Sequence, residues 1–598
     1  MTTSLNPNIQ KVLDRIREKS STSRQAYLAR IESMRTQGPN RNAMGCSNLA
    51  HGFAACGASD KQALKGGQAL NIGVVSAYND MLSAHQPMRD YPDWIKEVAR
   101  EHGAVAQLAG GVPAMCDGVT QGFEGMELSL FSRDVIAQST AIALSHNMFD
   151  AVICLGTCDK IVPGLMMGAL AFGHLPIMFS GAGPMPSGIS NGEKATVREQ
   201  YAKGEVGRAE LLESESAAYH APGTCTFYGT ANSNQMLMEI MGVHAPGTTF
   251  LAPGTDAREA AVRDTARKVL QHSDGAGEAY RPFGQMIDER SFVNAIVGLM
   301  ATGGSTNLTM HLVAMAAMAG IRIDWQDMSE ISAVVPLLAR VYPNGSADVN
   351  AMEAAGGLSY LFKELARAEL LCLDAVTMSD GSGTLRDYLA PDSQESGALD
   401  VLRPSDDPFQ ADGGLRLLTG NLGRGVIKTS AIAAERHVIE APAIVFDSQS
   451  AFQEAYKRGD LAERDFVAVV RFQGPKANGM PELHKLTPPL AVMQSMGQKV
   501  ALVTDGRMSG ASGKVPAAIH VCDEALDGGP LAYVQDGDII RLDAATGTLE
   551  VKADLSGRLT ARNHMRDTDN SFGRGLFAMN RQFVGSAEAG AMSIAASV

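Results

Sequence analysis

The amino-acid sequence predicts an α/β protein with an N-terminal parallel-sheet domain and a smaller, β-rich, barrel-like C-terminal domain. Three observations support this fold class. Short apolar runs alternate with longer helical patterns in the first half of the 598 residues; residues 379–414 are polar and rich in Gly, Asp and Pro; and the segments that follow are short and rich in β-branched residues. Alternating strands and helices are typical of a parallel sheet covered by helices, whereas closely spaced short strands favour a barrel or sandwich.

In chain order, the first predicted element is a surface helix over residues 9–34, within a polar N-terminus of mixed charge. Apolar runs bounded by turn residues then predict buried strands, and longer periodic segments predict helices. The strands are expected at residues 72–77, 151–155 and 175–180, and the helices at 125–147, 164–173 and 234–241. Ligands bind beyond the carboxyl ends of parallel strands, so we expect a site in the loops that follow these strands.

The polar stretch 379–414 is the best candidate for a linker. Beyond it, strands are expected at residues 443–446, 465–472, 500–503, 531–534 and 538–542. We therefore divide the chain into an N-terminal helical extension (residues 1–65), an α/β domain (66–400) and a barrel-like domain (401–598).

Composition and charge exclude several classes of protein. The formal net charge of −14 argues against nucleic acid as a partner, since a phosphate backbone requires a basic surface, but leaves room for a local basic pocket. Eight scattered cysteines without a C-x-x-C pair predict reduced thiols, and with no apolar signal segment this indicates a cytoplasmic protein. Residues 161–192 carry no formal charge, but repeated Pro and Gly predict a buried helix and strand there, so we expect no membrane span.

The most informative local run is Cys158-Asp159-Lys160, directly after the apolar segment 151–155. A lone cysteine is usually a small buried hydrophobic residue. Here a thiol, a carboxylate and an amine follow one another at the end of a predicted buried strand. Thiolates bind iron–sulfur clusters and carboxylates bind Mg²⁺ or Mn²⁺, and a second thiol in polar surroundings, Cys225, lies further along the chain. The pattern indicates a lyase that depends on a metal ion and a cluster.

Several long motifs in the same order resemble the dihydroxyacid dehydratase/6-phosphogluconate dehydratase family over nearly the whole chain. They are CDKIVPG (158–164), GTCTFYGTANSNQ (223–235), ATGGSTN (301–307) and ALVTDGRMSGASG (501–513). The runs NLAHGFAA (48–55), VVSAYNDMLSAHQP (74–87) and SGISNGEK (187–194) resemble the branch that acts on 6-phosphogluconate. Dihydroxyacid dehydratases often carry a cluster cysteine where this chain has Ala84, so the motifs do not identify the residue that would provide the third cluster ligand.

The resemblance implies that Cys158 and Cys225 bind an iron–sulfur cluster. A [4Fe-4S] cluster is favoured and [2Fe-2S] is the alternative. Cys116 is the candidate for a third ligand, and the alternative for it is an ordinary packed thiol. The other thiols are expected to be structural: Cys46, Cys56, Cys154, Cys372 and Cys522.

The resemblance also implies a divalent-metal site for Mg²⁺ or Mn²⁺ formed by Asp117, Asp159 and Glu482. Lys160 matches a lysine that is carboxylated in dihydroxyacid dehydratases, which makes it a candidate metal ligand and catalytic residue; its alternative is a plain ion pair with an acid. Ser509 matches the family's proposed general base. The α/β domain would thus carry the cluster and most of the metal ligands, and the barrel-like domain the base.

The residues that would bind a substrate phosphate are less defined. Backbone N–H groups of the Gly-rich loop around Ser512, together with Lys514, are one candidate. Lys194, Arg133 and Arg424 are others, and for each of these cations the alternative is a solvated or ion-paired side chain.

The implied reaction is dehydration of 6-phospho-D-gluconate to 2-dehydro-3-deoxy-6-phosphogluconate, a step of the Entner–Doudoroff pathway, by a homodimer. The nearest alternative is a dihydroxyacid or other sugar-acid dehydratase with the same residues. An alternative from another class is a cluster-binding sensor without catalysis. A sensor needs neither a divalent metal nor a base, so the combination of Asp117, Asp159, Glu482 and Ser509 favours an enzyme.

Overall fold

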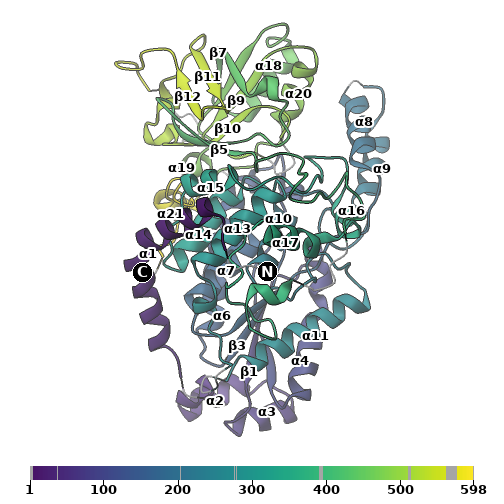
Figure 1. Cartoon of the computed structure of the whole chain (residues 1–598), viewed down its shortest axis with the longest axis vertical. Helices are drawn as coiled ribbons and strands as arrows, with labels where there is room; N and C mark the ends of the chain where they lie inside the picture. The colour runs from purple at the N-terminus through teal and green to yellow at the C-terminus, as the bar shows by residue number, and fades with distance from the viewer. Residues whose placement is uncertain are drawn as a thin grey trace.

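The computed structural model describes residues 4–36, 38–202, 204–274, 277, 279–389, 395–508, 513–560 and 575–596. A four-stranded sheet lies toward one end of the molecule and a closed β-barrel forms the other, with helices packed around the sheet and between the two (Figure 1). The predicted fold class, a parallel-sheet α/β region followed by a barrel, is confirmed.

The sheet has the strand order β2-β1-β3-β4, and every neighbouring pair is parallel. Its strands are β1 (Asn71–Ser76), β2 (Val105–Gly111), β3 (Ala151–Leu155) and β4 (Ile177–Ser180). β1, β3 and β4 are buried along their whole length, which is why they read as continuous apolar runs. The sequence analysis missed β2, because this edge strand is only partly buried and contains small residues and a glutamine.

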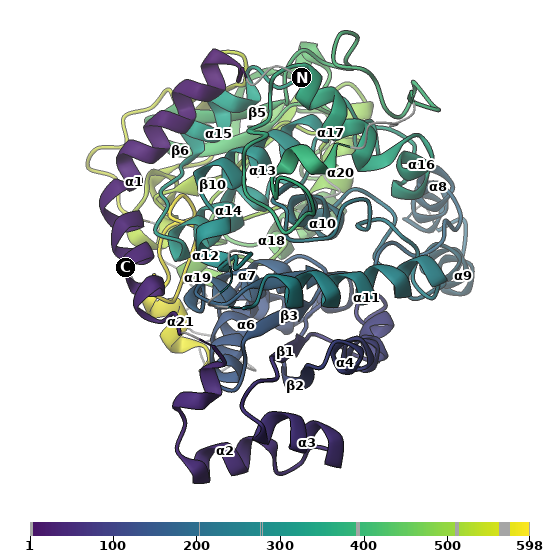
Figure 2. The ribbon, with the colours of Figure 1, turned by 60° about the horizontal axis from the view of Figure 1, so that its bottom comes forward.

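Helices surround the sheet. Between the N-terminus and residue 367 the α-helices are α1 (Pro7–Ser33), α2 (Cys46–Phe53), α3 (Ala58–Lys65), α4 (Tyr91–Glu101), α5 (Asp117–Thr120), α6 (Ser129–Leu144), α7 (Ile161–Ala171), α8 (Asn191–Ala202), α9 (Arg208–Ala218), α10 (Thr230–Ile240), α11 (Asp256–Gln271), α12 (Phe283–Met286), α13 (Glu289–Ala301), α14 (Leu308–Met318), α15 (Trp325–Ser332), α16 (Val349–Ala354) and α17 (Gly357–Arg367). α2 and α3 lie beyond the edge strand β2 (Figure 2).

The predicted N-terminal helix is confirmed as α1. The Asn6 side chain accepts a hydrogen bond from the backbone N–H of Asn8, and Pro7 occupies the first turn, where its missing N–H costs nothing. One face is buried, and Arg15 pairs with Asp327 of α15 at 2.8 Å. α1 is therefore fixed along the side of the α/β region (Figure 2).

The barrel closes in the order β10-β6-β5-β12-β11-β7-β8-β9. Its strands are β5 (Leu415–Gly420), β6 (Gly423–Lys428), β7 (Val438–Phe446), β8 (Phe466–Val470), β9 (Val500–Thr504), β10 (Ala517–Cys522), β11 (Ile539–Asp543) and β12 (Thr548–Val551). β7, β8, β9 and β10 run parallel to one another. The helices of this part are α18 (Gln449–Arg458), α19 (Pro475–Asn478), α20 (Thr487–Ser495) and α21 (Ala578–Phe583).

One strand predicted in the second half is wrong. Residues 531–533 belong to a short 3₁₀ helix, η7 (Pro530–Tyr533), and Val534 follows it in an extended conformation. Leu531 is fully buried, so the segment has the apolar character of a core strand, but Pro530 lacks the N–H that a central strand must donate. The apolar pattern of this segment therefore predicted its burial correctly but its conformation incorrectly.

Segments on both sides of the predicted division at residue 400 pack onto the α/β region. Gln410, in the polar stretch 379–414, accepts a hydrogen bond at its carbonyl from the N–H of Leu337, at 3.0 Å. Near the C-terminus, Arg133 of α6 donates to the carbonyl of Ala591 at 2.7 Å. The division of the chain at residues 65 and 400 stays a prediction.

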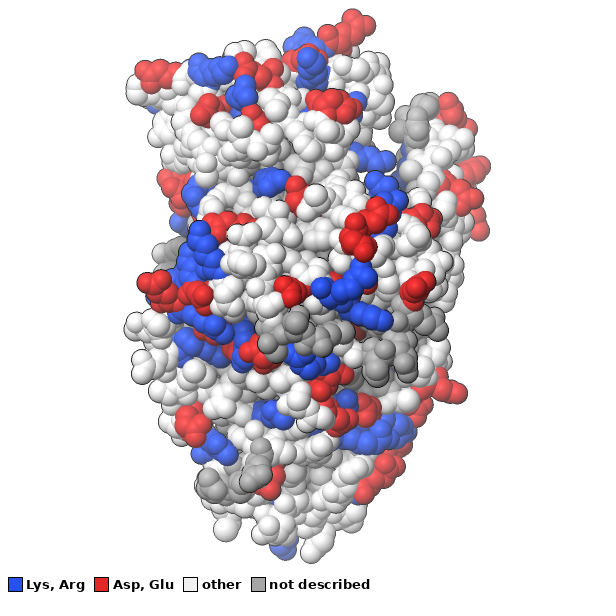
Figure 3. Space-filling model, viewed as in Figure 1, with Lys and Arg blue, Asp and Glu red and all other residues white. Residues whose placement is uncertain are grey.

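The charge-free stretch forms α7 and β4, as expected. Of the helices in the described part of the chain, none combines the length and the apolar character that crossing a bilayer requires. Acidic and basic side chains are interspersed on the face drawn in Figure 3.

Candidate active site

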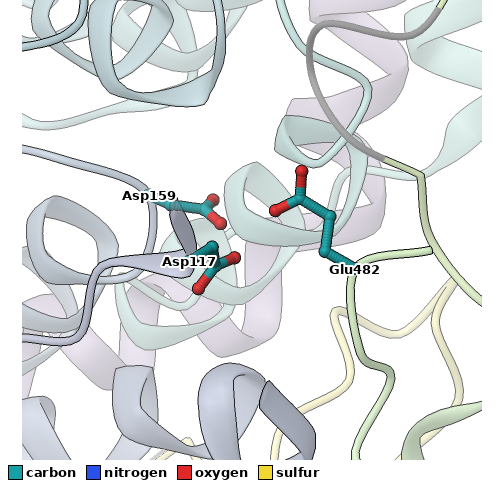
Figure 4. Close-up of side chains that lie close together, drawn as sticks. All are labelled: Asp117, Asp159 and Glu482. Carbon is teal, nitrogen blue, oxygen red and sulfur yellow. The ribbon is translucent and has the colours of Figure 1, made fainter. Parts of the chain in front are cut away.

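Three carboxylates from distant parts of the chain meet between the sheet and the barrel. Asp117 begins α5 after β2, Asp159 follows β3, and Glu482 reaches them from a barrel loop beyond β8 (Figure 4). One oxygen of each lies within 4.8 Å of the others. The side chains are only 10%, 15% and 9% exposed. All three follow parallel strands, so the two sets of strands direct their carboxyl ends toward one site.

Two buried cations lie among these carboxylates. Lys160 Nζ is 2.5 Å from Asp117 Oδ2 and 2.6 Å from Asp159 Oδ2. Arg507 places Nη2 2.8 Å from Asp117 Oδ2 and Nη1 3.4 Å from Asp159 Oδ2. Burial by itself would raise the pKa of both aspartates, but these positive charges outweigh it and hold each pKa below its usual value.

The carboxylate cluster fits a divalent cation. Asp117, Asp159 and Glu482 carry three negative charges against the two positive charges of Lys160 and Arg507, which leaves a negative surplus in a buried place. Mg²⁺ prefers oxygen ligands at about 2.0–2.1 Å, and small side-chain rotations bring three oxygens within 4.8 Å of one another to such an ion. Carboxylation of Lys160 would remove one cation and add a fourth acidic ligand.

Three thiols lie beside the carboxylates. Cys116 precedes Asp117, Cys158 precedes Asp159, and Cys225 is in the loop before α10. Burial raises the pKa of all three, to about 12 for Cys225, and a charge on Cys116 would raise the pKa of both Cys158 and Cys225 further. Thiols that act on one another in this way are close in space. Cysteine thiolates are the ligands of iron–sulfur clusters, and bonding to iron would offset the cost of ionising these desolvated thiols, so the donor set fits such a cluster.

α10 fixes both cysteine loops through two buried asparagines. Asn234 Nδ2 donates to the carbonyls of Cys158 (3.2 Å) and Asp159 (3.1 Å). Asn232 Nδ2 donates to the carbonyl of Cys225 at 2.7 Å. Cys158 has φ +74°, a left-handed conformation that costs a non-glycine residue about 1–2 kcal/mol. Such strain persists where the surroundings over-determine the backbone, and the Asn234 bonds do so here.

Three residues that contact the carboxylates were not assigned a role from the sequence. They are Arg507, Ser129, whose Oγ donates to Asp117 at 2.5 Å, and His311, whose Nε2 is 3.3 Å from Asp159 Oδ1. Arg507 lies inside the motif at residues 501–513, so an arginine directly after a predicted strand was an available signal. Ser129 and His311 lie in or next to largely apolar helical segments that give no local sign of a site.

The candidate phosphate contacts lie in different places. Lys194 is buried near Cys225, whereas Lys514 is exposed. Arg133 and Arg424 have other partners, Asp134 and Glu588 respectively, each at distances below 3 Å. The expected base Ser509 and the expected phosphate contact Ser512 lie outside the described residues.

The cysteines expected to be structural lie apart from these loops. Cys154 is buried in β3, and Cys372 is buried in a turn where its N–H donates to Asn294. Cys46 begins α2, Cys56 follows that helix, and Cys522 ends β10 in the barrel.

Comparison with known proteins gives the class of this protein, a dehydratase and therefore a lyase, and its family. The dihydroxy-acid/6-phosphogluconate dehydratase N-terminal model matches residues 70–386, and the corresponding C-terminal model matches residues 400–591. The chain belongs to the dihydroxy-acid/6-phosphogluconate dehydratase family.

Relatives in both branches of the family align along nearly the full chain. The phosphogluconate dehydratase of Rhizobium meliloti (strain 1021) is 57% identical over 98% of this chain and 99% of that protein. The phosphogluconate dehydratase of Escherichia coli (strain K12) is 54% identical over 99% of this chain and 100% of that protein. The dihydroxy-acid dehydratase of Methanothermobacter thermautotrophicus is 34% identical over 90% of this chain and 96% of that protein.

Proposed function

We propose that this protein dehydrates 6-phospho-D-gluconate to 2-dehydro-3-deoxy-6-phospho-D-gluconate, as a hydro-lyase of the Entner–Doudoroff pathway. The observation that carries the proposal is identity above 50% along almost the whole chain to proteins named phosphogluconate dehydratase. The buried cluster of Asp117, Asp159 and Glu482 beside three thiols supports it. Removal of the proton next to the substrate's carboxylate develops negative charge that the site must stabilise. The protein is expected to act in the cytoplasm as a homodimer.

We assign the cofactors by the chemistry of the donors. Cys158, Cys225 and Cys116 would hold an iron–sulfur cluster, with [4Fe-4S] favoured over [2Fe-2S]. Asp117, Asp159, Glu482 and a carboxylated Lys160 would hold Mg²⁺ or Mn²⁺. When bound, these groups supply Lewis acidity toward the substrate's oxygens.

The chain's own residues then position the substrate and move its proton. The carboxylate and C2 hydroxyl of the substrate would lie at the Asp117–Asp159–Glu482 end, where Arg507 adds positive charge. Ser509, as its alkoxide, would take the C2 proton and pass it to the departing C3 hydroxyl, which leaves as water, and the resulting enol would tautomerise to the 2-keto acid. The electron pair of the C2–H bond forms the C2=C3 bond, so no net oxidation occurs. Burial of the carboxylates keeps bulk water from competing with the substrate.

The decisive experiment is an anaerobic assay of reconstituted protein with 6-phosphogluconate, gluconate and 2,3-dihydroxyisovalerate, with iron and sulfide counted on the same sample. We expect kcat/KM to be highest for 6-phosphogluconate. Cys225→Ser should lose both iron and activity, whereas the matched control Cys154→Ser, in β3, should keep them. Higher kcat/KM on 2,3-dihydroxyisovalerate, or full activity without iron, would refute the proposal.

A further inference from the structure

Lys194 is a buried lysine near the Cys225 loop, and its ammonium is not in direct contact with a carboxylate of the described residues. Lys194, in α8, is only 8% exposed, and within the described residues no carboxylate oxygen lies within 4 Å of its Nζ. Its Nζ donates a hydrogen bond to the hydroxyl of Tyr219, at 3.1 Å, and lies 4.6 Å from the centre of the Tyr219 ring. An ammonium carries three N–H donors, so two remain available to a ligand.

Tyr219 completes a pair of donors that open toward solvent. Tyr219 is 42% exposed, so a small ligand can reach the pair. Because the Tyr219 oxygen accepts a hydrogen bond from Lys194, its own O–H is free to donate. Arg198 lies nearby and donates two hydrogen bonds to the carboxylate of Glu215, at 2.5 and 2.8 Å. Its positive charge is therefore already paired with that carboxylate.

The pair is positioned by close packing around α9. Tyr219 caps the C-terminal end of that helix, six residues before Cys225. The N–H of Ile189 donates to the carbonyl of Ala217 at 3.3 Å, and a Cβ on Gly188 would lie 2.1 Å from that same oxygen. The segment that leads into α8 therefore approaches the end of α9 as closely as glycine permits.

Backbone hydrogen bonds connect this pair to the Cys225 loop. Tyr219 lies six residues before Cys225 in the chain. The N–H of Met185 donates to the carbonyl of Thr224 at 3.0 Å, and the N–H of Thr224 donates to the carbonyl of Gly183 at 2.9 Å. The segment that leads from β4 into α8 therefore lies against the residue next to Cys225.

We infer that Lys194 and Tyr219 form the subsite for the phosphate end of the substrate, on the Cys225 side of the active site. The inference rests on the proposed function. If the acid end of a six-carbon sugar acid lies at Asp117, Asp159 and Glu482 and its C3 hydroxyl faces the thiols, then C4 to C6 continue past the thiols. A buried ammonium with free N–H donors and an accessible tyrosine hydroxyl suit a phosphate there.

Other lysines fit this role less well. Lys514 is exposed, so water screens its charge. Lys428 lies in a cavity whose other side chains are mostly apolar, and its Nζ already donates to the carbonyl of Gly303. Lys194 combines burial with free donors and proximity to a proposed cluster ligand.

The test compares Lys194→Met, Lys194→Arg and Tyr219→Phe with Lys514→Met, which removes the rival contact of the barrel loop, and with Lys65→Met, an exposed lysine at the end of α3, as the control. In anaerobic, iron-loaded enzyme, Lys194→Met should raise KM for 6-phosphogluconate roughly 10- to 100-fold, the value of one or two charge-assisted hydrogen bonds, and change kcat less. It should weaken competitive inhibition by inorganic phosphate by a similar factor. Tyr219→Phe should raise KM by a smaller factor, Lys194→Arg should restore part of the loss, Lys514→Met should raise KM less than Lys194→Met does, and Lys65→Met should match wild type.

Calorimetric binding of 6-phosphogluconate and gluconate separates this inference from the proposed function, because it requires no turnover. Preferential binding of the phosphorylated ligand that Lys194→Met removes supports the subsite even if no product forms. If Lys194→Met and Tyr219→Phe leave KM, phosphate inhibition and this preference unchanged, the inference is wrong. If Lys194→Met does not fold or load iron, Tyr219→Phe decides in the same way. A loss found with Lys514→Met alone would also overturn it, in favour of the barrel loop.

Discussion

Replacing Arg507 with methionine tests the electrostatics of the carboxylate cluster directly. Arg507 is fully buried and contacts Asp117 at 2.8 Å, Asp159 at 3.4 Å and the carbonyl of Met480 at 2.8 Å. Removing one member of a buried ion pair costs about 3–5 kcal/mol, because the opposite charges stay buried without compensation. We expect Arg507→Met to lower the free energy of unfolding of the metal-free protein by about that amount.

Metal binding should respond in the opposite direction. Arg507→Met removes one of two described cations, Lys160 and Arg507, that pair with these carboxylates, so a divalent cation compensates more unbalanced charge than in the wild type. We expect Mg²⁺ or Mn²⁺ to bind the variant at least about tenfold more tightly and so to stabilise it by about 1.4 kcal/mol more at saturating metal.

The assay is urea unfolding with and without metal, with Arg258→Met as the matched control. Arg258 is also buried, but its guanidinium donates to the carbonyls of Thr249 and Leu251, far from the carboxylates. Its loss should lower stability without altering the response to metal. The reasoning is refuted if metal-free Arg507→Met unfolds within about 1 kcal/mol of wild type, or if both variants gain equally from metal.

Two further predictions concern the support of the site and the barrel. Asn234→Ala removes the donor that the partly buried carbonyls of Cys158 and Asp159 share, so the free energy of unfolding should fall by about 1–3 kcal/mol. A chelator should also remove iron faster from this variant, and unchanged iron retention would contradict this role for Asn234. Burial, with help from Asp505, raises the pKa of Glu524 to about 8, against an ordinary value of 4.5. The folded protein thus keeps a proton that the unfolded chain releases, so this contribution is complete below about pH 4.5 and is lost as the pH rises toward 8. Glu524→Gln should flatten that decline in denaturant titrations at pH 5 to 8, and an unaltered slope would show that Glu524 does not cause it.

The local sequence was sufficient to predict a structural element where one short segment contains the whole pattern of that element. The strand at 151–155 was predicted at its observed bounds, because a fully buried strand is a continuous apolar run. The same physical rule fails at the partly buried edge strand β2, whose small residues have no clear pattern, and at residues 531–534, where a 3₁₀ helix is buried as deeply as a strand.

The sequence by itself determined which thiols and carboxylates of the site are neighbours along the chain. Cys158 and Asp159 are neighbours in the chain, as are Cys116 and Asp117, so each thiol–carboxylate pair was visible before any fold was known. The family motifs had already grouped Glu482 with those aspartates. Only the tertiary structure decided that Arg507 from the barrel contacts them and that Lys194 is buried. Distances between remote segments depend on how the sheet and the barrel pack against each other, and no local pattern of residues encodes that geometry.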